Sequence, residues 1–345
     1  MTKKIVLILL IIVLAISALV VAISGVFYSK INLPAFNIEK PCYIYINSDK
    51  NYDDVLAQLD TVGHIDDMRL FNLLAQRRNY PQHIKSGRYE ITPQMSYVEA
   101  VQLLRNGQQR AVKLTFNNVR LVGDFTQRIG NQLAVSADTL AALLRDTTVV
   151  AALGFDSTSI LTMFIPNTYE LFWNTSSRKF LERMKKEYNH FWTPERRAKA
   201  DSIALTPTEV SILASIVEEE TIKQAEYPIV AGLYWNRLKK GMLLQADPTV
   251  KFAVGDVTLR RILLAHLEIE SPYNTYKHTG LPPGPIRVPS IQGIDAVLNL
   301  THHNYLYMCA KEDFSGTHNF AVTLAEHTRN AKKYQAALNQ NKIMK

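Results

Sequence analysis

The chain has 345 residues, a formal net charge of +8 and 47% hydrophobic residues. This composition excludes an intrinsically disordered chain, which combines low hydrophobicity with high net charge. The 2 cysteines, Cys42 and Cys309, exclude a disulfide framework, and we expect them to stay unpaired because they lie in different predicted domains. The basic balance suits anionic lipid headgroups or an acidic polymer better than nucleic acid if the chain is exported, as its first segment predicts.

An uncharged apolar segment from Ile5 to Phe27 follows Lys3 and Lys4. It is long enough to cross a bilayer, which takes about 20 helical residues. Lysines before the segment and no basic cluster after it favour an N-terminus in the cytoplasm. We therefore predict a single-pass anchor within residues 1–30 of the cytoplasmic (inner) membrane, with the remaining chain on the periplasmic or extracytoplasmic side. A cleaved signal peptide is the alternative, although its apolar region would be long and no convincing cleavage site is present.

Residues 41–116 have the pattern of a small α+β unit. Strands are expected at 42–46, 85–91 and 111–116, and helices at 52–59, 66–77 and 96–106. Ser96 is the expected N-cap of the last helix, with Glu99 three residues later and Gly107 after its end. The order strand, helix, helix, strand indicates an α+β arrangement.

Residues 117–205 are expected to be mostly helical, with helices at 122–133, 137–144 and 177–191. Between them, Phe164 to Trp173 reads as an aromatic-rich loop. Core packing is the expected role of Phe164 and Phe172, whereas Tyr169 fits a core or a sugar-binding surface equally well.

Residues 206–345 hold the most informative segment of the chain, a helix predicted at 210–225. On a helical wheel, Glu220 falls on the apolar side with Ile216 and Val217. A carboxyl group among apolar side chains has a raised pKa, which is what a general acid near neutral pH requires. The alternative is an acidic surface run in which Glu220 is merely salt-bridged at the rim of the stripe.

The rest of this region alternates helices and turns. Helices are expected at 227–240, 258–266, 290–300 and 323–339, a strand at 305–310, and a stiff proline-rich segment at 279–289. Polar side chains between these elements are candidates to line one cleft with Glu220: Gln245, Asp247, Asn274, Thr275, Tyr276 and His318. Glycoside hydrolysis usually uses two carboxylates, and Asp247 is the candidate for the second, although a structural turn role fits it equally well.

Other chemistries lack their motifs. The sequence has no G-x-S-x-G, no H-E-x-x-H and no cysteine pair at zinc spacing, and Gly280 to Gly284 lacks the lysine of a P-loop. We therefore predict neither a metal nor a cofactor.

Four linked motifs resemble the YceG-like (MltG) family of endolytic murein transglycosylases. They are A-S-I-V-E-x-E-T, N-R-L-x-x-G-M-x-L-Q-x-D-P-T-V, Y-N-T-Y and G-L-P-P-G-P-I, at Ala214–Thr221, Asn236–Val250, Tyr273–Tyr276 and Gly280–Ile286. The resemblance covers nearly the whole chain. One departure lies at Thr162–Tyr169, where the acidic residues of the family pattern E-G-x-x-x-P-D-T-Y are absent.

The resemblance implies a single N-terminal membrane helix, a small LysM-like α+β subdomain at 41–116 and a mixed α/β catalytic domain at 206–345. The acid of the family maps onto Glu220, in agreement with the wheel. The expected substrate-binding residues are Gln245, Asp247, Thr249, Asn274, Tyr276 and His318. The implied activity is cleavage of peptidoglycan glycan strands to 1,6-anhydro ends, with partners among the cell-wall synthesis proteins of the membrane. A lysozyme-type muramidase using Glu220 and Asp247, and a non-catalytic wall-binding scaffold, remain the alternatives.

Overall fold

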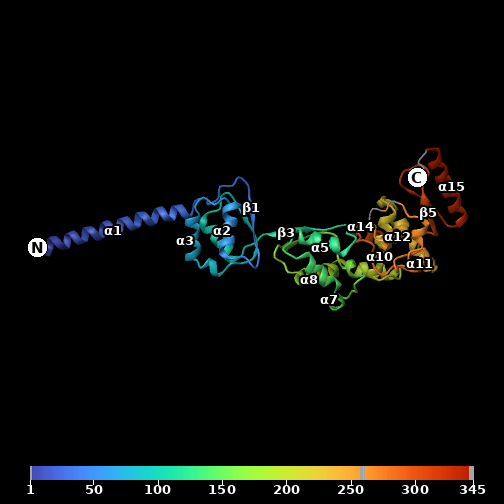
Figure 1. The fold of residues 1–345 in the computed structure, drawn as a ribbon, viewed down its shortest axis with the longest axis horizontal. Coiled ribbons are helices and arrows are strands. Elements are labelled where there is room, and N and C mark those ends of the chain that lie inside the picture. Colours follow the sequence, from blue (N-terminus) through green and yellow to red (C-terminus); the bar gives the residue numbers. More distant parts are fainter. Residues whose placement is uncertain (1, 118, 257–258, 260, 342–345) are drawn as a thin grey trace. The chain divides into compact units, whose positions relative to one another are not determined.

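The computed structural model describes residues 2–117, 119–256, 259 and 261–341, which form a mixed fold of helices and strands (Figure 1). The chain divides into two compact units. Unit 1 comprises Met1–Lys113, Gln132–Ala134 and Glu170–Thr175, and unit 2 comprises Leu114–Asn131, Val135–Tyr169 and Ser176–Lys345. The division of residues 117–345 into a middle region and a catalytic domain stays a prediction.

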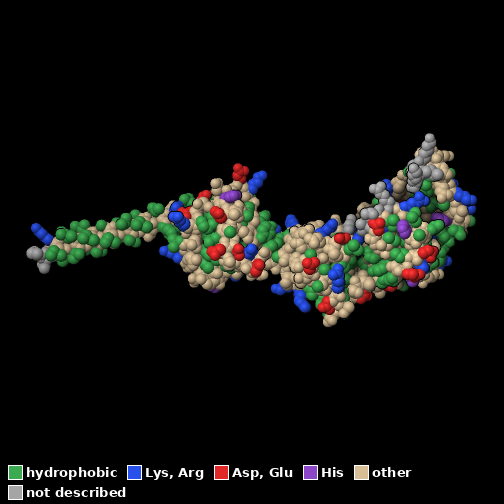
Figure 2. Space-filling model, in the orientation of Figure 1, with side chains coloured by type: hydrophobic (Ala, Val, Ile, Leu, Met, Phe, Trp, Pro, Cys, Tyr) green, Lys and Arg blue, Asp and Glu red, His purple; other side chains and the backbone are tan. Residues whose placement is uncertain are grey.

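The chain begins with a long apolar helix, α1 (Thr2–Ile31), whose described side chains form a continuous apolar surface (Figure 2). Its segment Lys4–Ile31 has a mean hydropathy of 3.5 over its most apolar window, which suffices for a membrane span. The end of α1 belongs to the fold of unit 1, because Phe27 and Ile31 pack against its core. Lys30 also forms an ion pair with Asp67 at 3.1 Å.

Unit 1 has the predicted order of strand, helix, helix and strand. Strands β1 (Cys42–Ile46) and β2 (Gly87–Ile91) pair antiparallel, and the helices are α2 (Tyr52–Thr61), α3 (Met68–Arg77), the 3-10 helix η1 (Tyr80–Gln82) and α4 (Tyr97–Asn106). The cap predicted for α4 is confirmed. The Ser96 side chain accepts from the Glu99 amide, the Glu99 carboxylate accepts from the Ser96 amide, and Gly107 ends the helix at φ 71°.

Strand β3 (Ala111–Thr115) pairs with β4 (Thr168–Phe172), so the predicted aromatic loop contains a strand. Side chains alternate along β4, which buries Tyr169 and Leu171 and leaves Phe172 52% exposed. The predicted core role is therefore confirmed for Phe164, which is 1% exposed, and wrong for Phe172.

The helices of unit 2 surround a second core. They are α5 (Val122–Gly130), α6 (Ala137–Arg145), α7 (Thr147–Ala152), η2 (Ile160–Met163), α8 (Ser177–Phe191), α9 (Pro194–Ser202), α10 (Pro207–Glu220), η3 (Gln224–Glu226), α11 (Tyr227–Lys239), α12 (Asp247–Val254), α13 (Leu264–Leu267), α14 (Ile291–Leu298) and α15 (Leu324–Gln340). Helices α10, α11 and α14 pack against one another (Figure 1). Strands β5 (Tyr307–Ala310) and β6 (His318–Ala321) form an antiparallel hairpin that packs against α15.

Two predicted elements of unit 2 differ from the structure. The turn predicted at 245–249 leads directly into α12, which begins at Asp247. The helix predicted at 258–266 begins outside the described residues, and α13 forms only at Leu264–Leu267. Both cysteines are free thiols, Cys42 in β1 and Cys309 in β5.

Candidate active site

Helix α10 carries the candidate acid at its C-terminal end. Thr206 caps its N-terminus in a reciprocal capping box with Glu209, and Pro207 occupies its first turn. The helix ends at Glu220 because Thr221 adopts an extended conformation, at φ −144° and ψ 143°. It is therefore shorter than the predicted helix 210–225.

The physical setting of α10 also differs from the prediction. Every residue from Val210 to Glu218 is buried, so α10 is covered on all sides and has no single apolar stripe. Glu220, beyond that stretch, is partly exposed. Its environment comes from its position at the helix end, not from a stripe.

Three consecutive glutamates have three different environments. The Glu218 carboxylate accepts hydrogen bonds from the Ser290 backbone amide and hydroxyl, and lies 3.6 Å from Arg287 Nε. Glu219 forms ion pairs with Arg120 at 2.5 Å and with Arg287 at 2.8 Å. The salt-bridged environment that was the alternative for Glu220 is therefore found at Glu219.

Glu220 forms no salt bridge with any residue that the structure describes. Its Oε1 accepts a hydrogen bond of 2.5 Å from the hydroxyl of Tyr234 on α11. Burial raises the pKa of Glu220 to about 7, and the negative charge of Asp247 adds to this effect. The Tyr234 hydrogen bond and the charge of Arg237 oppose the rise. Partial negative charge at the C-terminus of α10 also disfavours the ionised form.

Glu220 opens into a cavity of about 330 Å³. Its lining comes from α10, α11, the first residue of α12 and the segment before it, the 271–278 segment, the β5–β6 hairpin and α15. The lining residues are Glu220, Leu233, Tyr234, Arg237, Leu244, Gln245, Asp247, Tyr276, Tyr307, Met308, Leu324 and His327. The structure thus brings together four of the predicted site residues, namely Glu220, Gln245, Asp247 and Tyr276.

Asp247 and Tyr276 form a second carboxylate–phenol pair in this cavity. The Tyr276 hydroxyl donates to Asp247 Oδ1 at 2.6 Å. Burial raises the pKa of Tyr276, and the Asp247 carboxylate raises it further, so the phenol remains a donor. Gln245 adopts a left-handed backbone conformation at φ 50°, and its amide donates to the Thr275 carbonyl at 3.0 Å. This backbone contact joins the two segments that form the pair.

Thr249 and Asn274 lie beneath the cavity wall and are both fully buried. The Thr249 hydroxyl bonds to the Ala246 carbonyl at 2.7 Å and lies 2.9 Å from the Thr275 hydroxyl. The Asn274 side chain donates to the carbonyls of Leu267 and Ile269 and accepts from the Tyr276 amide. These contacts hold the backbone of the cavity wall in place.

His318 lies on β6 and is not among the residues that line the cavity. Its ring Nδ1 is 2.8 Å from the carboxylate of Glu226, a residue of η3. The structure therefore pairs the His318 ring with a buried carboxylate of the chain itself, and it does not bring His318 together with the residues that line the cavity.

Sequence reasoning did not select four polar residues that line the cavity, namely Tyr234, Arg237, Tyr307 and His327. Helical spacing was a usable signal for two of them, because Tyr234 and Arg237 are three residues apart and share a face of α11. Arg237 is 8% exposed and donates to the backbone carbonyls of Leu306 and Leu244, both at 2.6 Å. It thereby ties the hairpin to the segment before Gln245.

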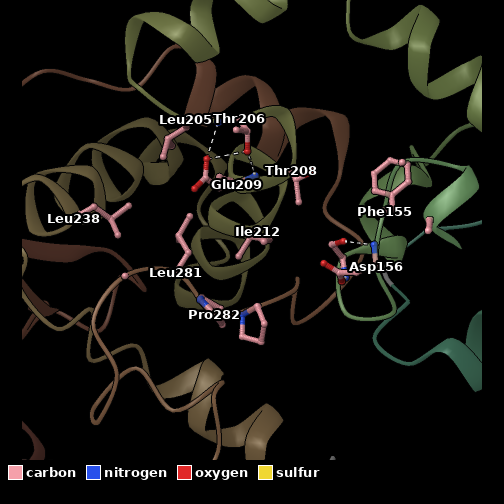
Figure 3. Close-up of a pocket in the computed structure, with 15 residues that line it drawn as sticks. Phe155, Asp156, Leu205, Thr206, Thr208, Glu209, Ile212, Leu238, Leu281 and Pro282 are labelled. Atoms are coloured by element: carbon pink, nitrogen blue, oxygen red, sulfur yellow. Dashed lines mark hydrogen bonds between the residues drawn. The ribbon is translucent and has the colours of Figure 1, made fainter. Parts of the chain in front are cut away.

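A larger cavity of about 770 Å³ lies at the opposite end of α10 (Figure 3). Its two lining carboxylates serve as caps. Glu209 accepts from the Thr206 amide and hydroxyl, and Asp156 accepts from the amides of Thr158 and Ser159. The Thr158 hydroxyl bond contributes most to lowering the pKa of Asp156, which is the wrong direction for a general acid. The cavity at the Glu220 end of the helix is therefore the better candidate for acid chemistry.

The described residues contain no group of three or more His, Cys, Asp or Glu side chains placed to hold a metal ion. What the smaller cavity offers is proton chemistry. It presents one carboxyl group that is half protonated near neutral pH, a second carboxylate and hydrogen-bond donors around them.

Comparison with known proteins shows the family of this chain. The profile of the YceG-like family matches residues 44–333, which is most of the chain. The chain belongs to the YceG-like family. A crystal structure of a YceG-like protein from Listeria monocytogenes has the same fold, with a TM-score of 0.55 and 24% identity, and the match covers 85% of this chain and 99% of that one.

Two relatives of this YceG-like chain are each named endolytic murein transglycosylase. The protein of Bacillus subtilis (strain 168) is 38% identical over 168 residues, which cover 48% of this chain and 45% of the relative. The protein of Streptococcus pneumoniae serotype 2 (strain D39) is 24% identical over 328 residues, which cover 86% of this chain and 59% of the relative. The YceG-like chain therefore spans about half the length of the curated relatives it matches.

Proposed function

We propose that this protein is an endolytic lytic transglycosylase of peptidoglycan. It cleaves the β-1,4 bond between N-acetylmuramic acid and N-acetylglucosamine within glycan strands and leaves 1,6-anhydro-muramic ends. The observation that carries this proposal is the carboxyl group of Glu220, which lines a cavity, forms no salt bridge with a described residue and has a pKa of about 7. The names of the two relatives support the same substrate.

The reaction needs one group that first donates and then accepts a proton. Protonated Glu220 gives its proton to the glycosidic oxygen as the bond to C1 breaks. The resulting carboxylate takes the proton of the muramic acid C6 hydroxyl, whose oxygen bonds to C1 and closes the anhydro ring. No water is consumed and Glu220 ends protonated, so a second carboxylate base is unnecessary. The substrate's acetamido oxygen stabilises C1 during the exchange, as in substrate-assisted glycosidases.

The other cavity residues position the glycan and adjust the acid. Tyr234 fixes the Glu220 carboxyl through its 2.5 Å hydrogen bond, and Asp247 favours the protonated form by its charge. Gln245 and Tyr276 line the cavity and supply hydrogen bonds to sugar hydroxyls and acetamido groups. Thr249 and Asn274 support the wall that presents them.

The remaining parts of the chain place this site at the cell wall. Helix α1 serves as a single-pass anchor in the cytoplasmic membrane, with both units outside, and unit 1 serves as a LysM-like wall-binding module. The strands cleaved are those newly made at the membrane, so that cleavage ends their elongation next to wall-synthesis proteins. The length and apolar surface of α1 support the anchor.

A lysozyme-type hydrolase is the second candidate, because Asp247 lines the same cavity as Glu220. In that reaction Asp247 is an essential nucleophile or base, and water produces reducing ends. The transglycosylase makes Asp247 a modulator of the acid, so Asp247→Asn would retain measurable activity.

The deciding experiment is mass spectrometry of glycan strands treated with the full-length protein in detergent, beside its Glu220→Gln variant. We expect anhydro-muramic ends from the wild type and none from the variant, which should still unfold in a cooperative thermal transition. Reducing ends would establish the hydrolase instead. Wall binding without cleavage by either protein would establish a scaffold.

A further inference from the structure

A buried carboxylate outside the cavity joins the end of α10 to strand β6. Glu226 is 8% exposed. Its Oε1 accepts the His318 backbone amide at 2.8 Å, and its Oε2 lies 2.8 Å from His318 Nδ1 and 3.0 Å from the hydroxyl of Thr221. Thr221 directly follows Glu220 in the chain. These three residues, Thr221, Glu226 and His318, are called the Glu226 cluster below.

The cluster joins the end of α10 to the β5–β6 hairpin, and both contribute residues to the cavity lining. Thr221 is the residue at which α10 ends, and its hydroxyl also accepts the Lys223 amide at 3.1 Å. His318 pairs with Ala310 in the β5–β6 hairpin, and Tyr307 and Met308 of the same hairpin line the cavity. Loss of the cluster would therefore release the end of the helix that bears Glu220 and the hairpin that forms part of the cavity wall.

We propose that the Glu226 cluster is a positioning device for Glu220, and that His318 serves it through Nδ1 without touching the glycan. This inference rests on the proposed function. A displacement of about 1 Å at a reacting group costs about 100-fold in rate. Breaking the cluster should therefore lower kcat by about 10- to 100-fold and change KM much less, because Gln245 and Tyr276, the proposed glycan-binding residues, are not bonded to the cluster.

The choice of substituent at His318 separates positioning from substrate contact. Asparagine places its side-chain amide where Nδ1 lies in histidine, whereas glutamine extends to the position of Nε2. We expect His318→Asn to retain activity and His318→Gln and His318→Ala to lose it. Activity in the glutamine variant but not in the asparagine variant would show an Nε2 contact with the glycan and overturn the proposal.

Changes at Glu226 test the other side of the contact. The single amide oxygen of Glu226→Gln cannot accept all three donors, so kcat should fall as in His318→Ala. The double variant should be no worse than either single one, because both break the same unit. Additive losses would contradict a shared role.

A matched control lies on the same strand. The Asn319 side chain donates to Glu312 at 2.8 Å, and Asn319→Ala should leave kcat and melting temperature unchanged. Hydrogen–deuterium exchange of residues 219–223 gives a readout that needs no activity. Faster exchange in His318→Ala and Glu226→Gln, but not in His318→Asn, is expected even if the wild type proves inactive on glycans. Unchanged exchange in a folded His318→Ala variant would overturn the proposal whatever the enzyme assay shows.

Discussion

At the residue scale, the pKa of Glu220 reflects groups that act in opposite directions. Burial raises this pKa most, the Tyr234 hydrogen bond lowers it by stabilising the carboxylate, and Asp247 raises it by charge repulsion. Because the proposed reaction starts from protonated Glu220, the rate should fall as pH rises through about 7.

Two substitutions should shift the pH at which the rate falls in opposite directions. This fall is the alkaline limb of the pH–rate profile. Asp247→Asn removes a negative charge, lowers the pKa of Glu220 and moves the limb to lower pH. Tyr234→Phe removes a bond to the ionised form, raises the pKa and moves the limb to higher pH. Each shift should be about half a unit to one unit, measured from the pH dependence of kcat/KM. Shifts of the same sign would contradict the proposed role of either neighbour.

The same raised pKa predicts a pH-dependent stability change in Glu220→Gln. The folded protein holds the Glu220 proton to about pH 7, whereas the unfolded chain releases it near the ordinary value of 4.5. Wild-type stability is therefore lost as pH rises from about 4.5 through 7. Relative to wild type, the variant should gain a few degrees in melting temperature between pH 4 and pH 8. A melting difference that does not change with pH would show that Glu220 titrates normally.

Glu220 stays the predicted acid, and the reason given for it from the sequence agrees only in part with the structure. An apolar neighbourhood does raise its pKa, yet α10 is covered by other helices on all faces, which periodicity within one helix cannot reveal. His318 shows more clearly what sequence patterns cannot reveal. Its partner Glu226 is 92 residues away, so only the fold could show that the ring bonds to a carboxylate of the chain itself.

At the element scale, helix and strand boundaries could be predicted where they depend on neighbouring residues, and could not where they depend on residues far away in the chain. The Ser96 cap with Glu99 and Gly107 was predictable because all its partners lie within one helix. The helix predicted at 210–225 extended too far because Thr221, which ends it, bonds to Glu226, whose carboxylate also accepts the backbone amide of His318, 92 residues later in the chain. Strand β4 was missed because its pairing partner β3 lies more than 50 residues earlier.

Helix α11 depends on a close approach that one residue permits. A Cβ on Gly232 would collide with the backbone carbonyl oxygen of Thr301 and lie 2.9 Å from His303 Nε2. Gly232→Ala should therefore destabilise the protein by about 1–3 kcal/mol. It should also lower activity, because Tyr234 and Arg237 lie on the same helix. Thermal unfolding and the glycan assay would measure both effects.

Gly123→Ala provides the matched control. This glycine lies in α5, and nothing is within 4 Å of an added Cβ. The substitution should be neutral or stabilising by up to about 1 kcal/mol, the ordinary helix preference for alanine. If Gly123→Ala lowered the stability as much as Gly232→Ala, the contact with the Thr301 carbonyl would not be the cause of the destabilisation at Gly232.

At the scale of the whole molecule, helix α1 separates the anchored form from the cleaved alternative. Full-length protein should remain with membranes after carbonate washing and retain its intact N-terminus by mass spectrometry. A variant lacking residues 2–26, which keeps Phe27 and Ile31 of the unit 1 core, should be soluble. An N-terminus within or just after α1 in the mature protein would establish a signal peptide instead.

The end of α1 is folded into unit 1 through Phe27, Ile31 and the Lys30–Asp67 ion pair. As the proposed membrane anchor, α1 would hold unit 1 at a fixed height above the bilayer, which a flexible linker would not do. Glycan bound by unit 1 would then meet the enzyme in a thin layer, at a raised effective concentration set by geometry. A module that binds the wall weakly would be enough to keep glycan near the site in such a layer. Affinities measured with strands free in solution would then understate how often the site is occupied at the membrane.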